Sequence, residues 1–399
     1  MIRAVIFRLH LTVAVAAGAV VLMLAATGVV LSLEEAVTGL AERRLFVAAA
    51  EGAGRLAPEE IVEAAGLAAT SLRYAADVRM PVRVYEGRDR YVHVDPYTGR
   101  VLGQGPGGVE RFFEGVHNWH RWFNVSSGSV RRARAVTGAV NVAFLFLLLT
   151  GPILWIPRPV TRRSLANVIV PRPRATGAWR DLNWHQVVGI WSVLPLAVIG
   201  ATGVTTSYPG VGDRVYPVVG RVVPVGVWPG GAGIGGEDAV ALERAGAGVV
   251  GVEGAEEGSR DSDEGGGAPG ADLGAVLAAA EVWVPEWRTL ILNVPRSGDR
   301  EVRVEVQGGR EGQPHKAGVL TVDVATGAVR DWESFADDTP GRRAQQFLRH
   351  AHTGEYWGLG GQLLAGLFSL AAVLMVWTGL SLAVRRGRRF VRLRRVLRR

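Results

Sequence analysis

Residues 183–204 of this chain read NWHQVVGIWSVLPLAVIGATGV, in which a histidine precedes an uncharged apolar run that contains a Thr-Gly pair near its end. The N-terminal stretch RLHLTVAVAAGAVVLMLAATGVV repeats this arrangement, because His10 stands as far before its Thr-Gly pair as His185 does. An ionisable side chain at the edge of a membrane-length segment is costly and is a functional-site hypothesis by default. The repeated spacing predicts one shared role for the two histidines.

Four charge-free apolar stretches have the roughly 20-residue length with which a helix crosses the hydrocarbon core of a bilayer. They are 11–33, 135–157, 186–208 and 361–384. Arg3 and Arg8 precede the first stretch, as in a signal peptide, but its apolar region exceeds the ~7–15 residues of such a signal. We therefore favour a retained anchor, and the sequence predicts a membrane protein with four spans.

The absence of cysteine limits the chemistry that the chain can perform. It excludes disulfides, iron–sulfur ligation, thiolate catalysis and covalent attachment of haem through a C-x-x-C-H motif. Any metal or cofactor must be held by histidine, methionine, carboxylates or backbone.

The net charge of +8 does not indicate nucleic-acid binding, because the arginines cluster beside the spans, between Arg158 and Arg180 and between Arg385 and Arg399. This is the positive-inside pattern. It places the N-terminus, the 158–182 loop and the C-terminal tail in the cytoplasm, and the two long connections outside. Three arginines on the outer side of span two depart from the rule: Arg131, Arg132 and Arg134.

These signals predict a four-helix transmembrane bundle with two extracytoplasmic α+β domains. We expect transmembrane helices within 1–33, 116–158, 183–208 and 346–384, extracytoplasmic domains at 34–115 and 209–345, a cytoplasmic loop at 159–182 and a basic tail at 385–399. The Gly-rich, acidic segment 230–270 is too weakly apolar to offset the entropy of ordering, so we expect a disordered insertion there.

The two outer regions resemble each other. The stretch 57–70 is typical of a helix, because Pro58 is followed by two acidic residues in its first turn; strands are expected within 81–103. The second region has a candidate helix at 272–281 and then strands within 289–332. The stretches VDPYTGRV (94–101) and VDVATGAV (322–329) share Asp, Thr-Gly and Val, which predicts a strand, a turn and a further strand in each. The chain therefore has the pattern of a duplication.

Six of the eight histidines lie at span edges and fall into two layers by orientation. His10 and His185 begin spans that start on the cytoplasmic side, while His117, His120, His350 and His352 precede spans that start outside. Two imidazoles that face each other across a bundle are what a bis-histidine haem requires. Two haems in such layers would lie on the order of 25 Å apart along the helices. His350 and His352 cannot both point inward, whereas His117 and His120 share one helix face, so geometry leaves that pair open.

Two further sets of residues accompany the histidines. Thr-Gly pairs at 27–28, 137–138, 150–151, 202–203 and 378–379 remove bulk where a macrocycle or a neighbouring helix comes close. Haem propionates need cationic partners, and lipid headgroups use the same cations. The candidates near the histidines are Arg8, Arg121, Arg131, Arg134, Arg180 and Arg349.

The chain resembles the PepSY-associated transmembrane family of bacterial inner-membrane proteins, whose members include ferric-siderophore reductases. The matching stretches are FRLHL, WHRWF with AVTGAVNVAFLFLLLTGPILWIPR, DLNWHQVVGIWSVLPL and RHAHTGEYWGLGGQLLAG. The resemblance implies that the outer ligands are His120 and His352, with His117 and His350 as neighbours. It also implies PepSY modules at about 56–104 and 272–335, and a location in the bacterial inner membrane, where the chain contacts lipid.

Our first functional hypothesis is a transmembrane electron-transfer protein with two b-type haems, held by His10 with His185 and by His120 with His352. As a haem-dependent reductase it would take electrons from a cytoplasmic or quinone donor and pass them to an extracytoplasmic ferric chelate such as a ferric siderophore. No G-x-G-x-x-G motif indicates a nicotinamide or flavin site of its own. The alternative is a non-redox PepSY module that binds or regulates an envelope partner. A metal transporter ranks last, because the four apolar stretches contain no acidic residue.

Overall fold

The computed structural model describes residues 1–48, 54–87, 90–157, 159–222, 272–310 and 312–397. The insertion expected at 230–270 lies outside the described residues. The chain divides into two compact units. The helical unit comprises Met1–Glu34, Phe113–Val215 and Leu348–Arg399, and the sheet unit comprises Glu35–Phe112 and Tyr216–Phe347.

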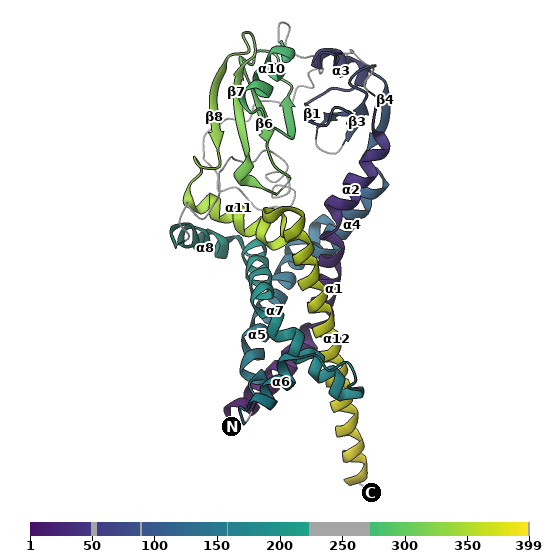
Figure 1. Cartoon of the computed structure of the whole chain (residues 1–399), viewed down its shortest axis with the longest axis vertical. Helices are drawn as coiled ribbons and strands as arrows, with labels where there is room; N and C mark the ends of the chain where they lie inside the picture. Colours follow the sequence, from purple (N-terminus) through teal and green to yellow (C-terminus); the bar gives the residue numbers. More distant parts are fainter. Residues whose placement is uncertain (49–53, 88–89, 158, 223–271, 311, 398–399) are drawn as a thin grey trace. The chain divides into compact units, whose positions relative to one another are not determined.

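Four long helices form the helical unit (Figure 1). They are α1 (Ile2–Leu31), α5 (Val130–Trp155), α7 (Gly177–Ser207) and α12 (Gly358–Leu397). Both α1 and α7 pack against α5 and against α12, so the order around the bundle is α1, α5, α7, α12. Each helix contains one of the apolar stretches expected to span a membrane, and each is long and apolar enough to do so.

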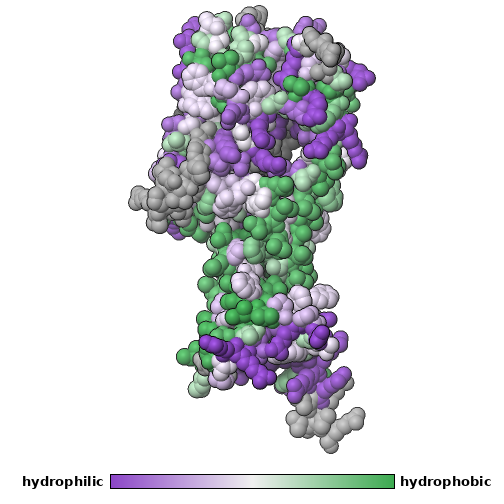
Figure 2. Space-filling model, viewed as in Figure 1, coloured by the Kyte–Doolittle hydropathy of each residue, from purple (hydrophilic) through white to green (hydrophobic). Residues whose placement is uncertain are grey.

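The bundle carries its large apolar side chains on the outside as well as in its core. Leu149, Trp191 and Leu194 are 72%, 68% and 77% exposed, and Figure 2 shows hydrophobic residues gathered over these helices. Soluble proteins rarely expose a continuous apolar surface of this kind. The prediction of a four-helix transmembrane bundle is therefore confirmed.

Short helices precede or follow the long ones. They are α2 (Glu34–Glu42), α4 (Gly108–Trp122), α6 (Arg162–Ile169), α8 (Pro209–Val222) and α11 (Pro340–Thr353). Single 3₁₀ turns occur at Arg43–Leu45, Ser127–Ser129, Pro314–Lys316 and Glu355–Trp357. Of these, α4 and α11 matter most, because they carry the histidines that precede α5 and α12.

The sheet unit contains one antiparallel sheet in the order β4-β3-β2-β1-β5-β6-β7-β8. Its strands are β1 (Ser71–Ala75), β2 (Val82–Glu86), β3 (Arg90–Val94), β4 (Val101–Gly105), β5 (Thr289–Asn293), β6 (Glu301–Gln307), β7 (Ala317–Asp323) and β8 (Val329–Ser334). Helices α3 (Pro58–Ala65) and α10 (Leu273–Trp283) pack against this sheet. The core between them includes Ile61, Val84, Val276, Leu292 and Leu320, each fully buried.

The strand order is a palindrome, as expected of a duplication. Each half is a helix followed by four antiparallel strands, and β1 pairs with β5 from Ser71↔Asn293 to Ala75↔Thr289. The sequence predicted two PepSY-like domains, and the structure shows that the two α+β halves share a single sheet.

The turns at 95–99 and 323–327 have the same hydrogen bond and the same glycine conformation. Thr98 Oγ1 donates to Asp95 over 2.7 Å, and Thr326 Oγ1 donates to Asp323 over 2.8 Å. The next residue in each turn is a glycine with positive φ, 71° at Gly99 and 67° at Gly327. A side chain at these glycines would meet Ala64 of α3 and Ala275 of α10, so both turns pack against their helices in the same way. The repeat read from the sequence is confirmed.

The local differences from expectation have simple causes. The helix expected over 57–70 ends at Ala65, because Gly66 takes the left-handed conformation with φ 62°. Strand β1 (Ser71–Ala75) begins a few residues later and was not predicted from the sequence. Five residues offer too short an alternation to recognise.

Candidate functional site

The two histidines that were expected as ligands on the outer side lie on two different helices and meet in the bundle. His120 of α4 and His352 of α11 bring their ring centroids within 6.4 Å of each other, with the ring planes inclined by 66°. Metal–imidazole bonds of about 2 Å require centroids on the order of 6 Å apart, since each centroid lies about 1 Å behind its nitrogen. The observed separation meets this requirement for a shared metal centre.

The other two histidines come from α1 and α7. His10 of α1 contacts Thr150 of α5, and His185 of α7 contacts Thr378 of α12. Each of the four histidine residues is half-buried. Below, the His10 and His185 pair is called the first layer, and the His120 and His352 pair the second layer.

All four rings use Nδ1 for their hydrogen bonds, and each contacts the threonine of a Thr-Gly pair. The Nδ1 to Oγ1 distances are 2.7 Å for His10 with Thr150, 2.7 Å for His120 with Thr27, 3.2 Å for His185 with Thr378 and 2.8 Å for His352 with Thr202. His185 Nδ1 also lies 3.0 Å from the Met375 carbonyl oxygen, and His352 Nδ1 lies 3.0 Å from that of Ile199. Because Nδ1 is engaged in each ring, Nε2 remains as the atom that can bind a metal.

The neighbouring histidines make different contacts. His117 Nε2 lies 2.7 Å from a Glu34 carboxylate oxygen, and His350 Nδ1 lies 3.0 Å from one of Glu355. The structure therefore brings His120 and His352 together and directs His117 and His350 to carboxylates.

The donor set of each layer suits a cofactor that brings ligands of its own. Within the described part of the chain, no group of three or more His, Asp or Glu residues could hold a bare metal ion. A haem iron already has four porphyrin nitrogens and needs only two axial ligands, which a pair of imidazoles supplies. The two layers fit haem better than a zinc site, which takes at least three protein ligands.

Two glycines of the Thr-Gly pairs lie against the rings. A Cβ added at Gly379 would lie 3.2 Å from His185 Cε1, and one at Gly28 would lie 3.8 Å from His120 Cε1. Gly379 therefore leaves little room for a side chain beside His185, whereas at Gly28 the tighter neighbour is the Ser369 hydroxyl, 3.2 Å from the added Cβ. At Gly203 the neighbour is instead the Asn141 side chain, 2.8 Å from the added Cβ.

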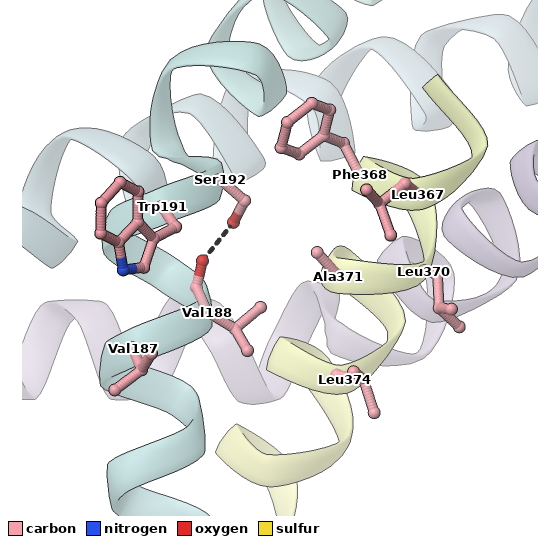
Figure 3. Close-up of a pocket in the computed structure, with 9 residues that line it drawn as sticks. All are labelled: Val187, Val188, Trp191, Ser192, Leu367, Phe368, Leu370, Ala371 and Leu374. Carbon is pink, nitrogen blue, oxygen red and sulfur yellow. Dashed lines mark hydrogen bonds between the residues drawn. The ribbon is translucent and has the colours of Figure 1, made fainter. Parts of the chain in front are cut away.

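Apolar side chains separate the two layers. Leu148, Leu196 and Ala372 are buried together and pack against neighbours such as Phe144 and Phe368. An apolar pocket of about 260 Å³ lies between α7 and α12. Figure 3 shows its lining, which includes Val188, Trp191, Phe368 and Leu374. The only polar side chain in its lining is Ser192, whose hydroxyl donates to the Val188 carbonyl over 2.6 Å.

Arg180 and Arg134, both proposed as propionate partners, have contacts with protein side chains. Arg180 donates to the Asp181 carboxylate over 2.9 Å, and Arg385 of α12 lies 3.2 Å from the same carboxylate. The Arg134 guanidinium lies 4.9 Å from the centre of the Trp122 ring. Asp181 thus ties the start of α7 to α12 beside the first layer.

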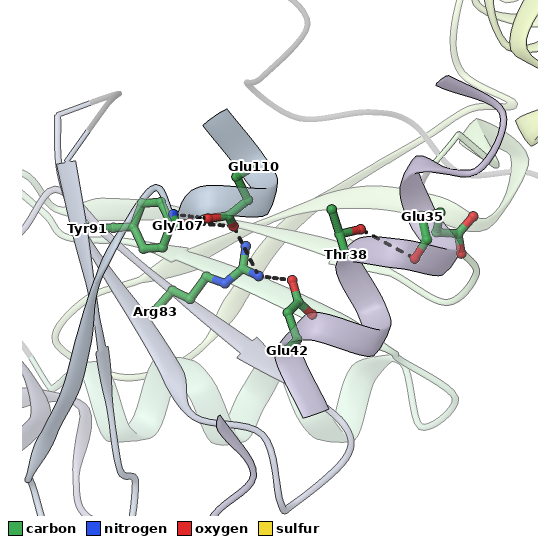
Figure 4. A network of polar contacts seen from close by, with 7 residues as sticks. All are labelled: Glu35, Thr38, Glu42, Arg83, Tyr91, Gly107 and Glu110. Atoms are coloured by element: carbon green, nitrogen blue, oxygen red, sulfur yellow. Dashed lines mark hydrogen bonds and ion pairs between the residues drawn. The ribbon is translucent and has the colours of Figure 1, made fainter. Parts of the chain in front are cut away.

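A separate polar cluster lies in the sheet unit (Figure 4). Arg83 of β2 contacts Glu42 of α2 and lies 3.9 Å from Glu110 of α4. Glu110 accepts a hydrogen bond of 2.5 Å from the Tyr91 hydroxyl. His93 pairs with Arg83 across the strands and is 7% exposed. Burial, helped by the positive charge of Arg83, lowers the pKa of the His93 imidazole to about 4.

The sequence missed the role of the threonine hydroxyls. It identified the Thr-Gly pairs but interpreted them only as small residues. The equal spacing of histidine and Thr-Gly pair in 8–30 and 183–204 could have indicated this role. It places the histidine of each helix in the first layer and the threonine of the same helix beside the second layer.

The comparison with known proteins agrees with this architecture. The chain matches none of the curated proteins. The model of the family described as the PepSY-associated TM region matches residues 7–386, which include all four spans, both halves of the sheet and both histidine layers. The chain therefore belongs to the PepSY-associated TM region family.

Proposed function

We propose that this chain is a transmembrane electron-transfer protein with two b-type haems, one between His10 and His185 and one between His120 and His352. The observation that carries the proposal is the 6.4 Å separation of the His120 and His352 rings, with Nδ1 of both rings held by hydrogen bonds. When bound, each haem supplies a one-electron redox centre, and two such centres give the bundle a path for electrons between the membrane faces.

The protein contributes orientation and a dry environment. The threonine hydroxyls hold the four rings, and the packed cluster of Leu148, Leu196 and Ala372 excludes water between the layers. His10 and Thr27 are 17 positions apart in α1 (27 − 10), as are His185 and Thr202 in α7 (202 − 185). At a rise of about 1.5 Å per residue, the two layers lie roughly 25 Å apart.

The charge distribution supports a direction for the protein in the membrane. The arginines of the 158–182 loop and of the end of α12 favour the cytoplasmic side. The first layer would then face a cytoplasmic or quinone donor, and the second layer an acceptor outside the bacterial inner membrane. A ferric chelate such as a ferric siderophore fits this role, because reduction to Fe(II) weakens the hold of a hard oxygen chelator on the metal.

The same packing argues against ion transport. A pathway for an ion needs polar groups along its length. Between the layers, Leu148, Leu196 and Ala372 form a packed apolar cluster, and the hydroxyl of the buried Ser192 is already bonded to the Val188 carbonyl.

The proposal is tested by the absorption spectrum of the purified full-length protein, with haem quantified per chain. We expect a Soret band that shifts on reduction with dithionite, and about two haems per chain. His185→Ala and His352→Ala should each lower the ratio to about one, whereas His117→Ala, three residues from a ligand but directed to Glu34, should keep two. A colourless wild-type protein with a monodisperse size-exclusion profile would overturn the proposal and leave a non-redox membrane-anchored PepSY module.

A further inference from the structure

The four threonines that contact the histidine layers have already used their hydroxyl protons. Each donates to the carbonyl four residues earlier in its own helix. The distances are 2.7 Å from Thr27 to Met23, 2.8 Å from Thr150 to Phe146, 2.8 Å from Thr202 to Val198 and 2.7 Å from Thr378 to Leu374. A hydroxyl has one proton and accepts through its lone pairs. Each threonine oxygen must therefore accept the hydrogen bond that it forms with a histidine.

Two backbone carbonyls lead to the same conclusion independently. His185 Nδ1 lies 3.0 Å from the Met375 oxygen, and His352 Nδ1 lies 3.0 Å from the Ile199 oxygen. A carbonyl oxygen can only accept, so Nδ1 carries the proton in both rings. In a neutral imidazole the other nitrogen, Nε2, then presents its lone pair.

We propose that Thr27, Thr150, Thr202 and Thr378 are positioning residues that fix the Nδ1–H tautomer of the four histidines and strengthen the electron donation of Nε2 to a bound haem iron. This inference rests on the proposed function. It adds that the threonines set the reduction potential of both centres.

The physical reason is the hydrogen bond on the far side of each ring. A group that accepts the Nδ1 proton raises the basicity of the ring as a ligand and fixes its orientation. A more basic ligand favours the oxidised iron, so the hydrogen bond lowers the reduction potential. Removal of the hydroxyl should raise it.

The two histidines of the first layer differ in the number of acceptors for the Nδ1 proton. Thr150 is the one acceptor for His10 Nδ1 among the described residues, whereas His185 Nδ1 has both Thr378 and the Met375 carbonyl. Loss of the Thr150 hydroxyl leaves the His10 proton without an acceptor. Loss of the Thr378 hydroxyl leaves the carbonyl in place, so its effect should be smaller.

The experiment is a spectroelectrochemical titration of the full-length haem-loaded protein, with electron paramagnetic resonance of its oxidised form. Thr150→Val should raise one of the two midpoint potentials by about 59 mV, which is a tenfold change in the one-electron equilibrium. It should also move the g-values of one centre. Thr378→Val should raise the same potential by less, and Thr150→Ser should restore the wild-type value.

The matched control is Thr205→Val. Thr205 is buried in α7, and its hydroxyl donates to the Thr202 carbonyl without contacting a histidine. This variant should change neither potential nor g-values. If Thr150→Val loses one haem, the shift in midpoint potential is measured in Thr378→Val instead.

Different results would overturn the proposed function and the threonine inference. A wild-type protein without haem overturns the proposed function. Haem-loaded Thr150→Val and Thr378→Val proteins with unchanged potentials and g-values overturn the threonine inference alone.

Discussion

At the scale of single residues, Gly379 shows how closely the bundle fits around a histidine. A Cβ at this position would lie 3.2 Å from His185 Cε1 and 3.6 Å from Nδ1. The 3.2 Å contact is tighter than ordinary van der Waals contact, and a packed interior transmits the displacement to the neighbouring group. A larger side chain here must therefore turn or shift the His185 ring.

Gly379→Val should weaken the first layer and leave the second unchanged. We expect haem per chain to fall from about two toward one, as measured by pyridine haemochrome assay against protein concentration. Gly387→Val is the control, because no atom lies within 4 Å of an added Cβ at this other α12 glycine. Two retained haems with wild-type spectra in Gly379→Val would contradict the described contact.

The candidate ligand residues could be predicted in part from the sequence. Cost of burial and equal spacing selected His10 and His185 as candidate ligands, and the angle between neighbouring positions limited His350 and His352 to one inward ring. The hydrogen bonds of Thr27 and Thr202 could not be predicted, because each joins two helices whose rotation about their axes is set by packing and not by local sequence.

At the scale of elements, the sheet carries a titratable group in a buried position. His93 of β3 lies on the side of the sheet that bears Arg83 and Tyr91, where Glu110 of α4 accepts a hydrogen bond from Tyr91. Its pKa is lowered to about 4 by burial and by Arg83. An unfolded chain takes up this proton near pH 6.5, so protonation favours the unfolded state.

Stability should therefore fall as the pH is lowered from about 6.5 to 4. The measurement is the thermal unfolding midpoint of the full chain in detergent across this range. His93→Gln, which removes the titrating group, should show a shallower decline than the wild type. Equal slopes for the two proteins would mean that His93 is protonated as easily in the folded state as in the unfolded state.

Elements with strong local signals were predictable. The long apolar runs predicted α1, α5, α7 and α12, and the Asp and Thr-Gly positions predicted the turns before β4 and β8. The pairing of β1 with β5 was not predictable, because it joins strands far apart in the chain. β1 and β5 are the two central strands of the sheet, and neither short sequence specifies its partner or its register.

At the scale of the whole molecule, the duplication accounts for the arrangement of the site. Each half forms its own hydrogen bonds, since His10 and His120 use threonines of the first half, and His185 and His352 use threonines of the second. Each layer, however, takes one histidine from each half. Neither half alone holds a complete pair of imidazoles, so the function proposed here requires both.

The most direct test of electron transfer through both layers uses sealed vesicles that contain the purified protein. Ferricyanide is trapped inside, a membrane-impermeant reductant is added outside, and the loss of ferricyanide absorbance is followed. The account predicts rapid bleaching with the wild type and loss of bleaching in both His10→Ala and His352→Ala, because each variant interrupts a different layer. Bleaching that continues at the wild-type rate in either variant would contradict it, as would its absence in a wild-type protein that holds two haems.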